Sequence, residues 1–219
     1  FELVGRIWSM GIACTALGIN VGHELGHRGK KYEQNLSKAL LLSTLYMHFF
    51  IEHNRGHHKR VATEDDPATA RYGEMVYAFW FRSVIFGYIS AWKIEAERLK
   101  KRNLSVISIH NEMLRFQIIQ LAFVGTIYFF FGSFVTLCFL AAATIGFSYL
   151  EVVNYIEHYG LLREQKENGR YERCQPHHSW NANYIMSNLA LFHLERHSDH
   201  HANPIRRYQS LRNFKDIPE

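Results

Sequence analysis

The chain has 219 residues, of which 47 % are hydrophobic and 15 % aromatic, so we expect one continuous core and a single domain over residues 1–219. The formal net charge is only +5, and the basic residues stand in short clusters, which argues against a nucleic-acid partner. Three cysteines without C-x-x-C spacing exclude a disulfide scaffold and a cysteine zinc ribbon. They are typical of free thiols in a reducing compartment.

The first apolar segment, residues 3–27, predicts a helix long enough to cross a membrane, ending in a polar turn that carries histidines. It has neither the basic start nor the small-residue cleavage site of a signal peptide. Because the chain begins at Phe1 without a methionine and enters this helix at once, we expect a partial chain whose N-terminal part is missing.

Two segments with a weaker membrane signal follow, and then a charged one. Residues 36–51 are apolar but short, which favours a re-entrant or interfacial helix that returns the chain to its starting side of a membrane. Residues 75–92 are aromatic-rich but interrupted by Arg82, as in a helix that lies in the membrane interface. Residues 95–102 predict a separate, solvated charged helix.

The strongest membrane signal is the run from 116 to 150, which contains no Asp, Glu, Lys or Arg. As one helix it would measure roughly 50 Å, well beyond the roughly 30 Å hydrocarbon core of a bilayer. We therefore expect two passes, with a turn at Gly132-Ser133 and a second pass that extends through Ile156. The remainder is polar except for a short apolar stretch at 184–194, so the sequence predicts an all-α, polytopic membrane helical bundle. A buried hairpin of a soluble protein is the alternative.

Fourteen histidines form clusters with informative spacing. Two imidazoles four residues apart on a helix lie one turn above each other and can converge on one metal. Adjacent rings such as His57 and His58 cannot face one point from a regular helix, so we expect two metal ions. Neutral imidazole suits Fe, Zn, Cu and Ni, and the ligands alone leave the metal open. The clusters comprise His23 and His27; His53, His57 and His58; and His197, His200 and His201.

Four carboxylates lie beside these histidines, namely Glu24, Glu52, Glu157 and Asp199. We expect them to accept hydrogen bonds from ligating histidines and fix the tautomers, with direct coordination as the alternative. The spelling His-Glu-x-x-His at 23–27 also matches a zinc metalloprotease, in which the glutamate is the general base. That reading leaves the other two clusters unexplained. A membrane metal transporter or storage protein is a further alternative.

At four separate motifs the chain resembles the integral-membrane alkane 1-monooxygenase family, the rubredoxin-dependent alkane ω-hydroxylases. Arg28 replaces a lysine of the family pattern, and Glu195 replaces a glutamine. Membrane fatty-acid desaturases share the histidine boxes, so a desaturase or a related, sterol-type hydroxylase is the runner-up, and the motif at Asn154 to Gly160 separates these from the alkane hydroxylases. The motifs are His23-Glu24-Leu25-Gly26-His27-Arg28, Glu52 to His58, Leu194 to Ala202, and Asn154-Tyr155-Ile156-Glu157-His158-Tyr159-Gly160.

The resemblance implies a multi-pass protein of the inner (cytoplasmic) membrane with two non-haem irons on the cytoplasmic side. It implies O₂ as co-substrate and hydroxylation of the terminal carbon of medium- and long-chain n-alkanes, with electrons from rubredoxin, supplied in turn by rubredoxin reductase and NADH. It also implies that nine histidines bind the irons: His23, His27, His53, His57, His58, His158, His197, His200 and His201.

Weaker expectations concern the surroundings. His178 is a candidate for a hydrogen bond to a ligating histidine, whereas His48 and His110 are expected to be packed and solvated. The basic clusters, Arg28 to Lys31, Lys59-Arg60 and Arg206-Arg207, are candidates for a rubredoxin docking surface or for contact with lipid head groups.

A substrate channel is expected beneath the histidines. If the first helix is regular, Trp8, Ile12, Ala16 and Ile19 form one stripe below His23. Phe147 lies in the same way below His158. Ordinary helix packing is the alternative explanation of such a stripe.

Overall fold

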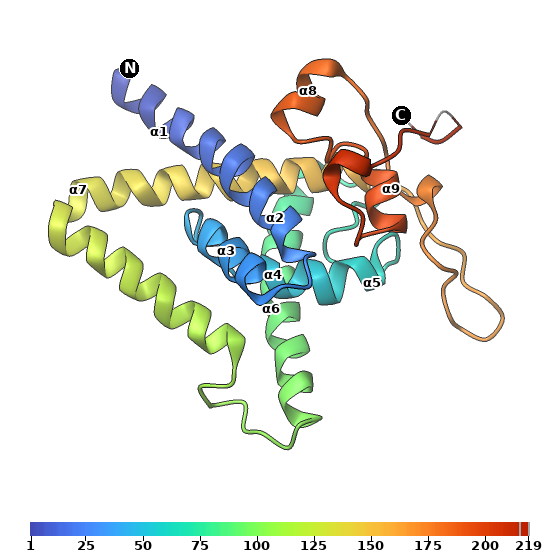
Figure 1. The fold of residues 1–219 in the computed structure, drawn as a ribbon, viewed down its shortest axis with the longest axis horizontal. Helices are drawn as coiled ribbons and strands as arrows, with labels where there is room; N and C mark the ends of the chain where they lie inside the picture. The colour runs from blue at the N-terminus through green and yellow to red at the C-terminus, as the bar shows by residue number, and fades with distance from the viewer. Residues whose placement is uncertain (215, 219) are drawn as a thin grey trace.

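The computed structural model describes residues 1–214 and 216–218, and within them the regular structure is helical (Figure 1). The predicted all-helical class is confirmed. The α-helices are α1 Glu2–Ala13, α2 Asn20–Gly26, α3 Lys31–Leu42, α4 Phe49–Ile51, α5 His58–Arg60, α6 Val76–Lys100, α7 Glu112–Glu157, α8 Ile185–Ala190 and α9 His197–Ala202. Two π-helical turns, Cys14–Ile19 and Glu52–His57, join α1 to α2 and α4 to α5.

The first helix is continuous over Glu2–Gly26 and is apolar enough to cross a membrane, as the sequence predicts. Its π-helical turn at Cys14–Ile19 changes the register, because π-helical hydrogen bonds run from i to i+5. The single regular stripe expected below His23 is therefore broken. Ile19 is 1 % exposed, whereas Ile12 is 43 % and Trp8 is 49 % exposed.

The segment after α2 returns on itself. α3 packs along α2, with the backbone of Ser37 beside Gly22 and Leu40 beside Gly18. The chain then reverses through a turn in which Leu45 adopts a positive φ of 55°, and α4 leads back toward the end of α2. This short hairpin brings Nε2 of His53 to within 2.6 Å of Nε2 of His23. Its re-entrant position in a membrane stays a prediction.

α6 corrects one prediction, because the expected interfacial and charged helices are a single helix, Val76–Lys100. Arg82 does not interrupt it, since the guanidinium pairs with Glu74 at 2.7 Å. The row of Tyr77, Phe81 and Ile85 is exposed along one side of the helix.

α7 is the second helix that is long and apolar enough to cross a membrane. It consists of two helices joined at Gly132, where φ is 76° and ψ is 177°, and Figure 1 shows the chain folding back at this bend. The turn predicted at Gly132-Ser133 is confirmed, and so is the extension of the second half through Ile156. α1 packs tightly against this second half, where a Cβ on Gly11 would lie 2.5 Å from Ile145 Cγ2.

The chain after α7 has short helices and irregular connections. The apolar stretch 184–194 contains α8, whose side chains Ile185, Met186 and Leu189 are 71 to 80 % exposed. α9 follows with the last histidine cluster. Cys14, Cys138 and Cys174 are free thiols, as expected.

Candidate metal centre

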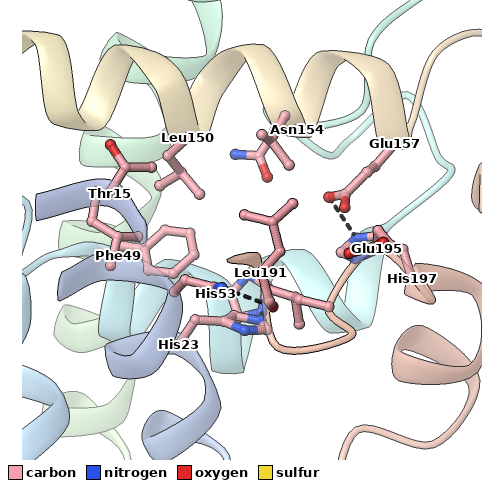
Figure 2. A pocket seen from close by; sticks show the side chains of 14 residues that line it. Thr15, His23, Phe49, His53, Leu150, Asn154, Glu157, Leu191, Glu195 and His197 are labelled. Atoms are coloured by element: carbon pink, nitrogen blue, oxygen red, sulfur yellow. Dashed lines mark hydrogen bonds and ion pairs between the residues drawn. The ribbon is translucent and has the colours of Figure 1, made fainter. Parts of the chain in front are cut away.

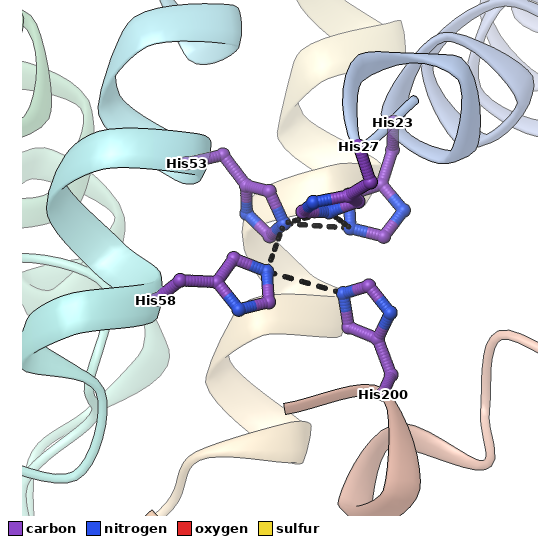
Figure 3. A group of neighbouring side chains, drawn as sticks. All are labelled: His23, His27, His53, His58 and His200. Carbon is purple, nitrogen blue, oxygen red and sulfur yellow. Dashed lines mark hydrogen bonds between the residues drawn. The ribbon is translucent and has the colours of Figure 1, made fainter. Parts of the chain in front are cut away.

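The nine histidines singled out in the sequence come together in two adjacent groups, although they belong to four separate parts of the chain. The first group, drawn in Figure 3, has five members and the second has four. In each group the ring nitrogens point toward a common centre. The first group is His23, His27, His53, His58 and His200, and the second is His57, His158, His197 and His201.

The first group is closely spaced. The Nε2 atoms of His23 and His53 are 2.6 Å apart, and Nε2 of His27 lies 3.2 Å from each of them. Nε2 of His58 is 2.9 Å from that of His53 and 3.2 Å from that of His200.

The second group repeats this spacing. Nε2 of His197 is 3.1 Å from that of His158 and 2.8 Å from that of His201. Nε2 of His57 lies 3.3 Å from that of His201. The rings of His58 and His201, one from each group, have centroids 4.5 Å apart, so the two centres are neighbours.

The spacing fits a metal ion at each centre. A neutral imidazole carries one N–H, so several Nε2 atoms that face one point cannot satisfy one another by hydrogen bonds. Ligand atoms about 2.1 Å from an ion and at right angles to each other are about 3.0 Å apart, close to the observed separations. The all-imidazole donor set suits iron, zinc or copper, and the residues present therefore fit the two irons that the resemblance implies.

Histidines that are adjacent in the sequence belong to different groups, as expected. This holds for His57 and His58, and also for His200 and His201. The expected convergence of His53 with His57, four residues on, is wrong, because Glu52–His57 is π-helical. In a π-helix residues five apart lie nearly one turn from each other, so His53 shares its group with His58.

Burial keeps the rings of the first group neutral. It lowers the pKa of His27 to about 3, with further lowering from the Arg28 charge. Burial, and then repulsion between neighbouring rings, holds the pKa of His53, His58 and His200 well below the ordinary histidine value. The neutral ring is the form that binds a metal, so the ligands are ready at neutral pH.

Three of the four flanking carboxylates pair with arginines. Glu24 lies 2.8 Å from Arg28, and Glu52 lies 2.5 Å from Arg60. Burial also raises the pKa of Glu52 to about 7, an effect that Arg60 opposes. Asp199 accepts from two arginines, Arg206 at 2.7 Å and Arg212 at 3.0 Å. Ion pairs with these arginines hold the three carboxylates in place beside the histidines.

Glu157 differs from the other three. Its Oε2 lies 3.3 Å from Nε2 of His197, the nitrogen that faces the second centre. Figure 2 shows the carboxylate pointing toward His197. This position is the one that direct coordination, the alternative considered from the sequence, would require.

Asp66 is a buried residue of the site that the sequence reasoning missed. Its Oδ2 lies 2.8 Å from Nδ1 of His57 and accepts a hydrogen bond from Thr69 at 2.6 Å. Burial alone would raise the pKa of Asp66, but the interactions with His57 and Thr69 leave it lowered. With the proton on Nδ1, His57 donates to this carboxylate, which leaves Nε2 for a metal.

Six other ligands lack such an acceptor among the described residues. Their buried Nδ1 atoms have no hydrogen-bond partner in that part of the chain: His23, His58, His158, His197, His200 and His201. Asp66 thus gives His57 a hydrogen-bond partner on Nδ1 that these six ligands do not have.

The remaining histidines lie outside both groups. His178 is buried and lies 3.1 Å from Glu172, so it contacts this carboxylate and no ligating ring. Its Nδ1 accepts the backbone N–H of Gln175. His48 is buried and His110 is exposed, as expected.

A cavity of about 50 Å³ opens beside both centres (Figure 2). His23 from the first group and His197 from the second both line it. Leu150 and Leu191 point into the same space and make its wall largely apolar.

The proposed channel residues do not all line this cavity. Ile19 lines this cavity, whereas Trp8 packs edge-on against Tyr149, and Phe147 stacks on Tyr46. Ile12 is partly exposed. A channel role for these side chains stays a prediction.

Comparison with known proteins supports the resemblance seen in the sequence. Alkane 1-monooxygenase 1 of Alcanivorax borkumensis is 48 % identical over 218 residues, which are 100 % of this chain and 54 % of that protein. Alkane 1-monooxygenase of Pseudomonas putida gives the same identity and the same shares. Alkane 1-monooxygenase of Ectopseudomonas oleovorans is 49 % identical over 217 residues, or 99 % of this chain and 54 % of that protein. The chain spans about half the length of these curated relatives.

A comparison with family models agrees with the histidine boxes that the chain shares with desaturases. A family model described as fatty acid desaturase matches residues 3–217, almost the whole chain. The match includes both histidine groups, the hairpin of α3 and α4, and both halves of α7. The chain therefore belongs to the fatty acid desaturase family.

Proposed function

We propose that the protein is a non-haem di-iron monooxygenase that hydroxylates the terminal carbon of medium- and long-chain n-alkanes, using O₂. The observation that carries the proposal is the apolar cavity bordered by ligands of both histidine groups, His23 and His197. The similarity to alkane 1-monooxygenases supports the same substrate class.

The nine histidines are proposed to hold two irons, five ligands at the first centre and four at the second. Two irons bound in this way would supply the redox chemistry that activates O₂. Glu157 is placed to complete the second centre, because its Oε2 already faces the ligating side of His197. Asp66 holds His57 in the tautomer that coordinates through Nε2.

The cavity is proposed to position one end of the alkane. Leu150, Val153 and Leu191 offer apolar contacts, and they exclude water from the space beside the histidines. An unsubstituted hydrocarbon has no polar group to orient it, so the shape of this wall determines which carbon reaches the centres. A narrow cavity favours the chain end over the interior carbons.

Electrons are proposed to come from rubredoxin, with rubredoxin reductase and NADH upstream. Two of the predicted basic clusters are adjacent, since Arg28 donates to the backbone oxygens of Ile205 and Arg206 at 3.1 and 3.3 Å. His27, next to Arg28, is partly exposed. A basic surface beside an accessible ligand suits an acidic electron donor.

We place the protein in the inner membrane as a multi-pass protein, with the metal centres on the cytoplasmic side. The apolar helices Glu2–Gly26 and Glu112–Glu157 support this position. The aromatic row along α6, with Tyr77 and Phe81, suits the interface between lipid and water.

The decisive experiment uses the full-length protein in detergent, with octane, rubredoxin, rubredoxin reductase, NADH and ¹⁸O₂. We expect two irons per chain and 1-octanol that carries ¹⁸O. His158→Gln removes a fully buried member of the second group and should lower both the iron content and the yield of product. Elemental analysis and GC–MS measure the two quantities in the same samples.

The matched control is His110→Gln, which changes an exposed histidine outside both groups and should leave both quantities unaltered. Octene in place of octanol would favour a desaturase, the second candidate that the family match supports. One zinc per chain and no oxidised product would overturn the proposal and favour a metalloprotease or transporter.

A further inference from the structure

A groove of about 310 Å³ lies between α3 and the start of α7, apart from the metal centres. α3 lines it with Lys38, Ala39 and Leu42, and α7 lines it with Arg115, Phe116 and Ile119. Lys38 and Ala39 lie four and three residues before Leu42, and Arg115 and Phe116 lie four and three residues before Ile119, so each helix presents one face to the groove.

The groove changes from charged to apolar along its length. Near one end Lys38 pairs with Glu112. Near the other end the backbone N–H of Met47 donates to the side chain of Gln120 at 3.2 Å. Leu42 lies one turn beyond Lys38 on α3, and Ile119 lies one turn beyond Arg115 on α7, so each helix brings an apolar side chain to the groove next to its cation.

The charged end has surplus positive charge. Glu95 and Glu112 are buried and form ion pairs with the surrounding cations, so among the described residues the network contains four cations and two carboxylates. The Arg115 side chain is 47 % exposed, and its guanidinium forms a long ion pair of 3.8 Å with Glu112. The guanidinium is therefore available to another anion. The cations are Lys38, Arg55, Arg98 and Arg115.

We propose that this groove binds one anionic phospholipid. Its phosphate pairs with Arg115, because a guanidinium can bind two phosphate oxygens at once. An acyl chain lies over Ala39 and continues along Leu42 and Ile119. The excess of two positive charges favours an anionic head group over a zwitterionic one, which would bring its own cation.

The surroundings favour a lipid over a peptide or a free anion. α7 continues from the groove as a helix apolar enough to cross a membrane, and Ile118 and Leu121 beside it are 54 and 73 % exposed. The charged end thus lies at the polar end of a membrane-spanning helix, where lipid head groups are found. The inference depends on the proposed membrane position but not on the metal centres or the substrate.

Native mass spectrometry of the full-length protein, titrated with phosphatidylglycerol or phosphatidylcholine, tests the proposal. We expect one tightly held phosphatidylglycerol and weaker binding of phosphatidylcholine. Arg115→Gln should weaken phosphatidylglycerol about fivefold, the effect of one basic residue near an anionic lipid surface. Ala39→Phe fills the groove without altering its charge and should also displace the lipid.

The matched control is Arg102→Gln, which removes an exposed arginine outside the groove and should leave binding unchanged. Equal phosphatidylglycerol affinity in Arg115→Gln, Ala39→Phe and Arg102→Gln would overturn the proposal. Displacement of the lipid by millimolar inorganic phosphate would also overturn it, since the acyl chain would then contribute nothing. Iron content, measured in the same samples, reports separately on the metal centres.

Discussion

His57 has different partners on its two ring nitrogens. Nδ1 lies 2.8 Å from the Asp66 carboxylate. Nε2 lies 3.3 Å from the Nε2 atom of His201. The histidines could be found in the sequence because their spacing and number are unusual. Asp66 could not, because it lies in a loop without helical spacing, and the cluster of acids at 64–66 was its only signal.

Replacing Asp66 by asparagine should weaken the second metal centre selectively. Asparagine is neutral, so it no longer raises the basicity of His57 or fixes its tautomer as strongly. Such a change costs about 10- to 100-fold in metal affinity. We expect Asp66→Asn to lose the iron of the four-histidine group first when a chelator is titrated into the protein.

Asp65→Asn is the control, because Asp65 is an exposed neighbour with the same side chain. Metal bound to the Asp65→Asn variant should leave at the same chelator concentrations as in the unaltered protein. Identical chelation curves for the two variants would show that Asp66 does not support His57.

Among the elements, the two π-helical turns account for most of what the sequence could not reveal. Hydrophobic spacing located the first helix, the hairpin of α3 and α4, and the hairpin of α7 because burial and length determine them. The π-helical turns depend on tertiary contacts, such as the Thr15 hydroxyl donating to Gly146 on α7 at 2.8 Å. A pattern based on 3.6 residues per turn therefore assigned His57 to the wrong partner.

The bend of α7 gives a stability prediction. Gly132 combines a φ of 76° with a ψ of 177°, a region that is essentially restricted to glycine. Gly132→Ala should therefore lower the free energy of unfolding by about 1–3 kcal/mol. The thermal unfolding midpoint in detergent measures the effect.

Gly125→Ala provides a control of opposite sign in the same hairpin. Gly125 is helical, and an added Cβ would meet nothing within 4 Å. Alanine in a helix interior is favoured over glycine by about 1 kcal/mol, so this variant should unfold at a slightly higher temperature. Equal midpoints for the two variants would contradict the role assigned to the bend.

In the whole molecule, the metal centres join segments that are distant in the chain. The first group connects the end of α2, the turn after α4 and α9, and the second connects the end of α7 to α9 and the same turn. Bound metal should therefore stabilise the fold as well as the site, because ligands that bind only the folded state stabilise it.

The metal-free protein should lose stability in mild acid. Because burial lowers the pKa of His27 to about 3, the unfolded chain binds more protons than the folded chain between pH 3 and about 6.5. Stability is fully present above about pH 6.5 and falls as the pH drops toward 3. We expect the unfolding midpoint of the chelated protein to decrease steadily from pH 7 to 5.

His27→Gln should make this pH dependence less steep, although His53, His58 and His200 still contribute to it, whereas His110→Gln, at an exposed position, should not change it. A midpoint that stays constant from pH 7 to 5 in the chelated protein would show that the buried rings do not control its acid stability.

The position of α9 has a consequence for synthesis of the protein. His200 completes the first group, and His197 and His201 complete the second, so neither group has all its ligands until the ribosome has passed residue 201. Translation from the N-terminus thus inserts the apolar helices long before the centres can form. If the apolar helices enter a membrane as proposed, metal loading is accordingly a late event that acts on a chain already in the bilayer.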